Sequence, residues 1–526
     1  MKAKLLCLFL ILLISFACST DDSEPQTNAG FVTVTPRPTS TTAPVTDFSL
    51  HEQALKPAFA TDIDQVVQRG LTHYRIHLTI VPDSLKPSSR PKIQAVMEIR
   101  FTNTEPVLLN QVYFRLFPNT PAYGAQADGQ GGSMQILDTR LNGEPTDTQM
   151  LADNSAMFVP FRRALKPGES NELFIAYEAT VPTATGPGNG LYAYDNETLS
   201  LSGFYPVIPV FDHNGWHLHI GPVFADSTHT DVALYDITVT NPAQMTLVAT
   251  GKTMKTTANN DGTVTTHILT GPVRDVYMVL NPFFQSASQE VEGTLVTSYF
   301  PPAYRQAGEF ALDVGTSALR IYNDIITPYP YREFDLVAVP VPRTLGGVEY
   351  PGVIALGQRY YGQIGDQEDR DFMEFVVAHE VAHQWWYGLV GNDQFTYPWL
   401  DEALTQYTTI HYYERRYGSG KRAEMINRMF TPLYWQLQDT GGNRPVYGTA
   451  DEFTEWLYYP VVYGKGPLFF EAVRDQIGDL AYFASLRQYA ADYRYGLATP
   501  KDLLDTISQT SGQSIDSAYQ DWILTD

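Results

Sequence analysis

The stretch VVAHEVAHQWWYG, at positions 376–388, contains two histidines four residues apart, with a glutamate directly after the first. In a helix, residues four apart lie on one face, so His379 and His383 can present ring nitrogens to a single metal ion. Glu380 then points about a quarter turn away, beside such an ion instead of on it. Buried imidazoles need polar partners, and a metal ion supplies them. The spacing therefore predicts a metal site, although this motif by itself also arises by chance.

A third ligand is offered by the segment YPWLDEALTQY, which begins a helix at Pro398 and places Glu402 in its first turn. Two antiparallel helices joined by a short connection would bring Glu402 back to the histidine pair. Two imidazoles and a carboxylate leave a fourth tetrahedral position open, which is typical of a catalytic zinc ion. Zinc lowers the pKa of water to about 7, and Glu380 can take its proton as general base. The expected chemistry is attack of metal-activated water on a polarised carbonyl.

The elements around these motifs indicate two domains, as the length of 526 residues also does. From about residue 70 to 285, apolar and polar residues alternate in short runs separated by Gly, Pro, Asn and Asp, which predicts an all-β domain. From about residue 305 the apolar period lengthens and predicts helices, with one strand in the segment FDLVAVPV. We expect an N-terminal β-domain over 51–288 and an α+β domain over 289–526. The predicted strands are at 73–81, 95–103, 171–179, 234–242 and 275–283, and the predicted helices at 307–326, 371–386, 400–418, 466–478 and 500–510.

The N-terminus has the pattern of an export signal, with two lysines, a short apolar run and small residues ahead of Cys18. Residues 1–17 are the predicted signal peptide, and the Thr/Pro-rich residues 18–50 are a predicted tether. Cys18 resembles the lipid-modified cysteine of bacterial lipoproteins, whereas Ser15 and Ala17 also suit ordinary cleavage before it. The protein is therefore expected to be exported, either anchored in the cell envelope through Cys18 or secreted.

The charge balance argues against one class of partner. Lys and Arg total 35 against 58 Asp and Glu, which gives a formal net charge of -23. Such a surface repels the phosphates that a nucleic-acid-binding protein must neutralise. We therefore expect no nucleic-acid partner.

Four motifs together resemble one family, the zinc aminopeptidases of the aminopeptidase N and leukotriene hydrolase type, which are gluzincins with a thermolysin-like catalytic domain. HEVAHQWW and WLDEALTQY are similar to its two zinc motifs, with eighteen residues between His383 and Glu402. GGVEYPG, at 346–352, is similar to the family's G-x-M-E-N exopeptidase motif. VYGKG, at 462–466, is similar to its Y-x-K-G segment. The β-rich half resembles the family's saddle-shaped N-terminal domain.

The resemblance implies a function and a set of roles. One zinc ion per chain would be bound by His379, His383 and Glu402, and Glu380 would activate water. Glu349 would bind the free α-amino group of a peptide substrate, and Tyr463 would donate its hydroxyl to the oxyanion of the tetrahedral intermediate. Gly346 and Gly347 belong to the same substrate-binding motif. The implied reaction is removal of N-terminal residues from peptides.

The sequence departs from the family pattern in three respects. Val348 and Tyr350 stand where Met and Asn are usual. Near LSLSGFYPV, the β-domain lacks the Gln or Glu that usually helps to bind the substrate amine. Larger members continue into a helical C-terminal domain, and a chain without it is expected to have a more open cleft.

Two other functions stay open on the sequence alone. A zinc endopeptidase of the same fold is favoured if Glu349 does not face the cleft, and a non-catalytic peptide-binding lipoprotein would keep the fold without the reaction. A second candidate metal site is the segment GWHLHIG, which places His217 and His219 on one face of a predicted strand, with His229 further along. Histidines that alternate along a strand usually reflect only the strand pattern and not a metal site.

Overall fold

The computed structural model describes residues 47–526 except 86–89, 124–130, 187, 189, 227 and 344. The predicted signal peptide, Cys18 and most of the tether lie outside these residues, so export and lipidation stay predictions. The last residues assigned to the tether are folded, because a 3-10 helix, η1, begins at Ser49 and ends at Ala54. Within the described part of the chain, no helix is both long and apolar enough to cross a bilayer.

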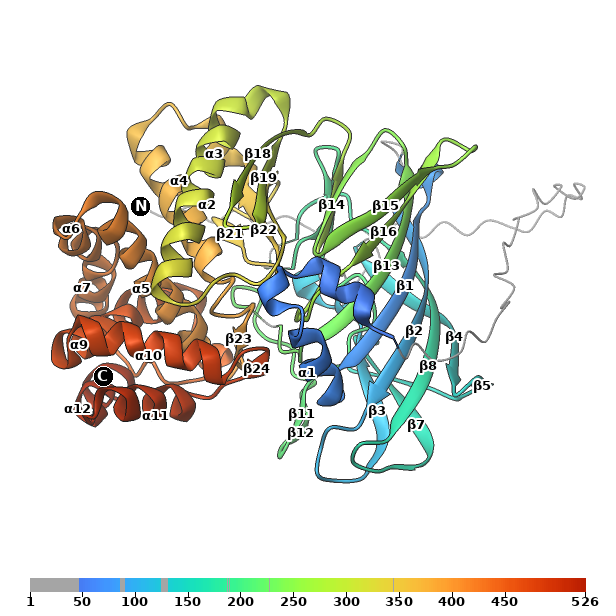
Figure 1. The fold of residues 1–526 in the computed structure, drawn as a ribbon, viewed down its shortest axis with the longest axis horizontal. Helices are drawn as coiled ribbons and strands as arrows, with labels where there is room; N and C mark the ends of the chain where they lie inside the picture. Colours follow the sequence, from blue (N-terminus) through green and yellow to red (C-terminus); the bar gives the residue numbers. More distant parts are fainter. Residues whose placement is uncertain are drawn as a thin grey trace, which may run out of the picture. The chain divides into compact units, whose positions relative to one another are not determined.

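The first half is built on an eight-stranded sheet (Figure 1). Along its long strands, side chains alternate between a buried and a more exposed face. This alternation is the period-2 pattern that predicted the strands. Neighbouring strands are antiparallel except for β1 and β13, which pair in parallel. In sheet order, the strands are β15 (Lys252–Ala258), β16 (Thr263–Leu269), β13 (Ala233–Pro242), β1 (Thr72–Ile80), β2 (Lys92–Thr102), β8 (Ser170–Thr180), β4 (Ser133–Leu141) and β5 (Glu144–Pro145).

Three smaller sheets complete this half. One contains β3 (Leu109–Arg115), β7 (Ala156–Leu165) and β6 (Gln149–Leu151), and a second contains β14 (Thr246–Ala249), β17 (Met278–Asn281), β10 (Thr198–Leu201) and β9 (Tyr192–Asp195). The third is the hairpin of β11 (Phe211–Asp212) and β12 (Gly215–Trp216). A short helix, α1 (Asp62–Gln68), precedes the first strand. The predicted β-domain is therefore present.

The second half begins with a five-stranded mixed sheet whose order is β18-β19-β20-β22-β21. Its strands are β18 (Gln285–Val291), β19 (Thr294–Phe300), β20 (Glu333–Val339), β22 (Val353–Gly357) and β21 (Gly347–Val348). The predicted domain boundary at residue 288 falls inside β18, which pairs with β19 along its whole length. The sheet of the second half thus starts at Gln285, because a hairpin partner cannot be separated from its strand.

Helices pack on this sheet and extend beyond it (Figure 1). The long helix α2 (Arg305–Ile325) lies against β18 and β19, and Gly308 allows the close approach, because a Cβ there would fall 1.9 Å from the ring of Phe300. The other helices are α3 (Gln358–Gly362), α4 (Gln367–Ala382), α5 (Pro398–Tyr417), α6 (Gly420–Met429), α7 (Thr431–Thr440), α8 (Glu455–Tyr459), α9 (Gly466–Ile477), α10 (Asp479–Asp492), α11 (Pro500–Ser511) and α12 (Asp516–Tyr519). Two short strands, β23 (Val390–Gly391) and β24 (Gly496–Leu497), pair in parallel.

A buried arginine joins the two halves. Arg274, from the first half, donates hydrogen bonds to the carbonyl oxygens of Thr230 at 3.1 Å and Tyr387 at 2.6 Å, and to that of Gly496. Thr230 belongs to the β-domain, whereas Tyr387 follows α4 and Gly496 begins β24. One guanidinium therefore holds three backbone segments that are far apart in sequence.

We expect Arg274→Met to lower the free energy of unfolding by about 3–5 kcal/mol, because it leaves three carbonyl groups without their buried charged donor. Urea denaturation followed by tryptophan fluorescence measures this change. Arg163→Met is the matched control, since Arg163 forms an exposed ion pair with Glu169 and its loss should leave the free energy of unfolding nearly unchanged. Equal stability of the two variants would contradict the role given to Arg274.

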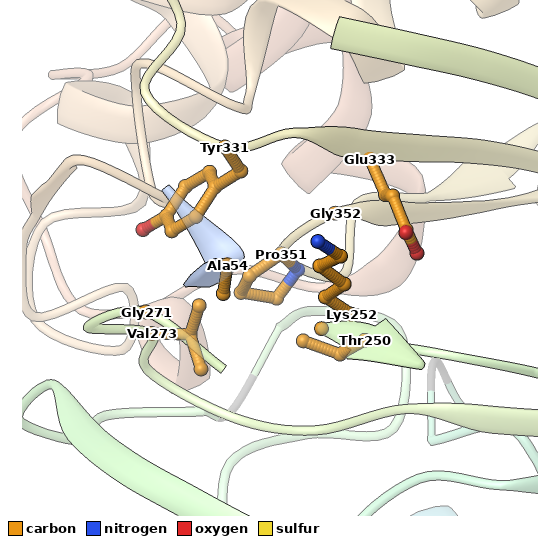
Figure 2. A pocket seen from close by; sticks show the side chains of 10 residues that line it. Ala54, Thr250, Lys252, Gly271, Val273, Tyr331, Glu333, Pro351 and Gly352 are labelled. Carbon is orange, nitrogen blue, oxygen red and sulfur yellow. The ribbon is translucent and has the colours of Figure 1, made fainter. Parts of the chain in front are cut away.

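A small cavity also lies at the junction of the halves, between η1, the loop after β14 and the residues before β20 (Figure 2). Tyr331, Lys252 and Glu333 are among its lining residues. Its volume is about 10 Å³, which is room for about one water molecule. The cavity is a gap in packing at this junction and is too small for a ligand.

Candidate active site

Helix α4 carries His379, and His383 directly follows its last residue, Ala382. Local sequence explains where the helix begins. Asp366 caps it by accepting a hydrogen bond from the backbone N–H of Glu368 at 2.8 Å, and two acidic residues occupy the first turn, where the helix dipole favours them. The hydroxyl of Tyr322 on α2 donates to the carbonyl oxygen of Ala378 at 3.0 Å. This bond from a neighbouring helix braces α4 directly beside the histidine pair.

The three predicted metal ligands meet at one point. Nε2 of His379 lies 3.0 Å from Nε2 of His383, and Oε2 of Glu402 lies 3.3 Å and 3.4 Å from these two nitrogens. Bonds of about 2.0–2.1 Å to a tetrahedral zinc ion place ligand atoms roughly 3.3 Å apart. All three residues are buried. The observed separations therefore match the spacing that such an ion requires.

His383 is held in orientation by its other ring nitrogen. Nδ1 lies 3.0 Å from Oδ1 of Asp401, 2.9 Å from the carbonyl oxygen of Trp386 and 3.2 Å from the hydroxyl of Thr405. A proton on Nδ1 satisfies these acceptors and leaves the Nε2 lone pair facing Glu402. Gln394 in turn donates to the second oxygen of Asp401. Asp401 thus supplies the carboxylate that commonly orients a metal-binding histidine.

Glu380 lies against the edge strand β21. A Cβ on Gly347 would fall 2.7 Å from Oε1 of Glu380, so only glycine leaves room for this carboxyl group. Within the described residues, Oε2 of Glu380 is buried without a hydrogen-bond partner. Burial raises the pKa of Glu380 to about 8, although the nearby His383 acts in the opposite direction. The Oε2 atom of Glu380 can therefore exchange a proton with a molecule bound next to this carboxyl group.

Glu349 also faces the site, and the side-chain amide of Gln384 explains its position. The amide nitrogen donates to the carbonyl oxygen of Tyr350 at 3.2 Å, and the amide oxygen accepts from the backbone N–H of Gly352 at 2.8 Å. These two hydrogen bonds fix the segment 346–352, which is similar to the exopeptidase motif, to the residues that follow α4. One ligand atom each of Glu349, His383 and Asp401 lies within 4.8 Å of the other two.

A second carboxyl group, Asp226 from the β-domain, approaches the same place. One oxygen each of Asp226, Glu349 and Glu402 lies within 4.8 Å of the other two. Burial, first, and the charge of Asp226 raise the pKa of Glu349 well above its usual value. Asp226 and Glu349 also line a cavity of about 20 Å³, which is room for about one water-sized group.

Tyr463 also lies near the site, on the π-helical turn Pro460–Lys465 that follows α8. Its ring centroid lies 6.3 Å from that of His379, and the ring of Tyr459 stacks on it at 4.8 Å. Burial, first, and the carboxylate of Glu402 raise the pKa of Tyr463 well above its usual value. The phenol is therefore protonated at neutral pH and can donate a hydrogen bond.

The site contains more acidic than basic side chains, and a bound cation would balance this excess of negative charge. Five buried or half-buried carboxyl groups, those of Asp226, Glu349, Glu380, Asp401 and Glu402, surround two imidazoles. Burial opposes a charge on His383, but Glu349, Asp401 and Glu402 raise the pKa of His383 well above its usual value. Burial likewise opposes a charge on Glu402, but the two histidines hold its pKa well below the usual range. A divalent cation between these groups would neutralise the excess negative charge.

All eight residues singled out from the sequence lie in or beside this site: His379, Glu380, His383, Glu402, Glu349, Gly346, Gly347 and Tyr463. Sequence reasoning missed Asp401 and Asp226. Asp401 directly precedes Glu402, and its position in the first turn of α5 was the available signal. Asp226 lies in an irregular segment between β12 and β13, where no motif or period marks it.

The expectation for the segment GWHLHIG was wrong in one respect. Strand β12 ends at Trp216, so His217 and His219 do not share a strand face. The hairpin β11–β12 extends by one further backbone hydrogen bond, from the N–H of His217 to the carbonyl oxygen of Val210 at 2.9 Å, and His219 lies beyond it. His219 packs on Phe395 with ring centroids 3.8 Å apart, whereas His217 lies 4.8 Å from the ring of His229.

Known proteins share both the sequence and the fold of this region. Residues 310–522 match the peptidase family M1 domain. Aminopeptidase N of Lactococcus lactis subsp. lactis is 25% identical over 41% of this chain and 26% of its own length. Aminopeptidase M1-A of Oryza sativa subsp. japonica is 21% identical over 85% of this chain and 49% of its own length. The chain thus spans about half or less of the length of these curated relatives.

Solved structures extend the similarity to both halves. The M1 zinc metallopeptidase from Deinococcus radiodurans superposes with a TM-score of 0.62, at 19% identity, over 86% of this chain and 93% of its own. A variant of the Deinococcus enzyme bound to a Tyr-Ser-Ala substrate gives a TM-score of 0.61, at 18% identity, over 86% of this chain and 94% of its own. Residues 310–522 therefore match the peptidase family M1 domain, and the chain shares the fold of the M1 zinc metallopeptidase from Deinococcus radiodurans.

Proposed function

We propose that the protein is a zinc-dependent aminopeptidase that removes N-terminal residues from peptides. The observation that carries this proposal is the position of Glu349 and Asp226, whose carboxyl groups converge beside the metal-ligand triad and line a cavity of about 20 Å³. Two carboxylates in a dry pocket of this size suit one ammonium group. The relatives named aminopeptidases and the substrate-bound Deinococcus structure support the same function.

His379, His383 and Glu402 would hold the zinc ion, because their donor atoms lie 3.0–3.4 Å apart and belong to the types that zinc prefers. When bound, zinc supplies Lewis-acid chemistry, polarising a carbonyl group and lowering the pKa of water. The edge strand β21 would bind the substrate backbone, since peptides commonly add to an exposed sheet edge.

The protein's own residues then carry out the proton transfers. Glu380 takes a proton from the attacking water and later delivers it to the leaving amine, so its carboxyl group acts first as base and then as acid. Tyr463 donates its hydroxyl proton in a hydrogen bond to the oxyanion as the carbonyl carbon becomes tetrahedral. Glu349 and Asp226 pair with the substrate ammonium group and thereby place the first peptide bond, and no later one, in front of Glu380.

The test compares hydrolysis of aminoacyl amides that have a free amine with that of the same amides after N-acetylation. The unchanged protein should hydrolyse only the free set. In Glu349→Gln, kcat/KM for the free set should fall by about 10²–10³-fold, because a buried ammonium loses its charged partner. Asp226→Asn should lower kcat/KM in the same direction.

Glu290→Gln is the matched control, because Glu290 is exposed on β18, at the other edge of the same sheet. It should leave kcat/KM unchanged. Equal hydrolysis of both sets by the unchanged protein would refute amine recognition and indicate an endopeptidase of the same fold.

A further inference from the structure

A second group of metal-binding side chains lies apart from the triad. One ligand atom each of His217, His229 and Asp393 lies within 4.8 Å of the other two. His217 and His229 come from the segment between β12 and β13, and Asp393 comes from the connection between β23 and α5. The group therefore joins the β-domain to the loop that links the two helices of the catalytic motifs.

The contacts of the two imidazoles are those expected around a metal ion. Nδ1 of His229 lies 3.2 Å from the carbonyl oxygen of Asn392, and Nε2 of His217 lies 3.0 Å from Oδ2 of Asp212. Nδ1 of His217 lies 3.8 Å from Oδ2 of Asp393. Metal-binding histidines commonly donate their second ring N–H to a carboxylate or a backbone carbonyl. A backbone carbonyl lies within hydrogen-bond distance of His229 Nδ1, and a carboxylate lies near His217 Nε2, which leaves Nε2 of His229 and Nδ1 of His217 for the shared space.

The environment of these three side chains also favours a bound cation over a simple ion pair between a histidine and a carboxylate. Asp393 already accepts hydrogen bonds from the backbone N–H groups of Phe395 at 3.2 Å and Thr396 at 3.1 Å, which hold its carboxylate in place. The side chains of His217 and Asp393 are 23% and 15% exposed, so water can reach the group and complete a coordination shell.

We propose that His217, His229 and Asp393 bind a second divalent cation of the zinc type, with Asp212 orienting His217. Two imidazoles and one carboxylate are donors that zinc accepts, whereas magnesium and calcium prefer oxygen ligands alone.

The second ion would stabilise the connection that shapes the first site. Asn392 donates to the carbonyl oxygen of Tyr397 at 3.1 Å, just before α5 begins. Gln394 donates to Asp401, whose other oxygen contacts His383. A cation that ties Asp393 to the β-domain therefore restrains the residues that orient His383 and lead into Glu402. This inference concerns metal binding alone and does not depend on peptidase activity.

The test is a metal count on the full chain. Protein stripped with a chelator is incubated with ZnCl₂, freed of unbound metal by gel filtration and analysed by inductively coupled plasma mass spectrometry. The unchanged protein should hold two zinc ions per chain. His229→Ala and the double variant His379→Ala/His383→Ala should each hold one, because each loses a different site. His219→Ala is the matched control and should hold two, since His219 is half-exposed and lies outside the group.

A second variant separates the loss of a metal ligand from misfolding of the loop. Asp393→Asn keeps a side-chain oxygen to accept the bonds from Phe395 and Thr396, so the loop is retained while the anionic ligand is lost. In Asp393→Asn/His379→Ala/His383→Ala, calorimetric titration with ZnCl₂ should show at least about tenfold weaker binding than in His379→Ala/His383→Ala. No zinc in His379→Ala/His383→Ala, or two in His229→Ala, would overturn the proposal, and so would equal affinity in these two titrated variants.

Discussion

Replacing Glu380 with Gln is expected to lower kcat by about 10³–10⁴-fold while the bound zinc stays constant. The carboxyl group takes part in two proton transfers, and general acid–base catalysis by one group is typically worth about 10²–10⁴-fold. Glutamine has nearly the same shape and fits beside Gly347, but it cannot accept the proton of the attacking water. The proposed metal ligands are His379, His383 and Glu402, so the metal count should not change. Initial rates on the preferred aminoacyl amide, with zinc measured on the same samples, give both quantities.

Glu380→Asp serves as the companion variant. Aspartate keeps the carboxyl base on a side chain that is one methylene shorter. The kcat of this variant should therefore lie between those of the unchanged protein and Glu380→Gln. Wild-type kcat in Glu380→Gln would exclude Glu380 as the base. A zinc-loaded wild-type protein that hydrolyses no amide or longer peptide would favour the non-catalytic binding protein.

Replacing Tyr463 with Phe has the second-largest expected effect, a fall in kcat of about 10²–10³-fold with little change in KM. The hydroxyl contacts the oxyanion only as the tetrahedral state forms, and the loss of one such donor typically costs this much. Because burial and Glu402 raise the pKa of Tyr463, the phenol stays protonated and the effect should be the same across neutral pH. Steady-state kinetics at several pH values measures it.

Tyr459→Phe is the control for this prediction. Tyr459 stacks on Tyr463 with ring centroids 4.8 Å apart and is 45% exposed, so removing its hydroxyl tests the packing of the pair without touching the oxyanion donor. Its kcat should stay within about twofold of the unchanged protein, since surface substitutions of this kind rarely disturb a fold. A similar loss in both variants would assign the effect to packing.

The local sequence determined the helices and strands of this protein and the motifs that contain its predicted metal ligands. The periods of 3.6 and 2 residues placed α2, α4, α5, α9 and α11 and the long strands of the β-domain close to their observed positions. His379 and His383 could be paired because four residues make about one helical turn, and that relation needs no tertiary information. Glu402 followed from the short connection between two helices.

Only the tertiary structure decided which distant residues join these motifs. Asp226 lies in an irregular segment whose position depends on the packing of the β-domain against the second half, so no local pattern could place it beside Glu349. His217, His229 and Asp393 come together for the same reason, since neither a strand period nor a helical spacing relates them. The five-stranded sheet begins at Gln285, inside the predicted β-domain, because pairing with β19, and not local propensity, sets where that sheet begins. Spacing along the chain determined the metal triad, whereas contacts between the two halves completed its surroundings.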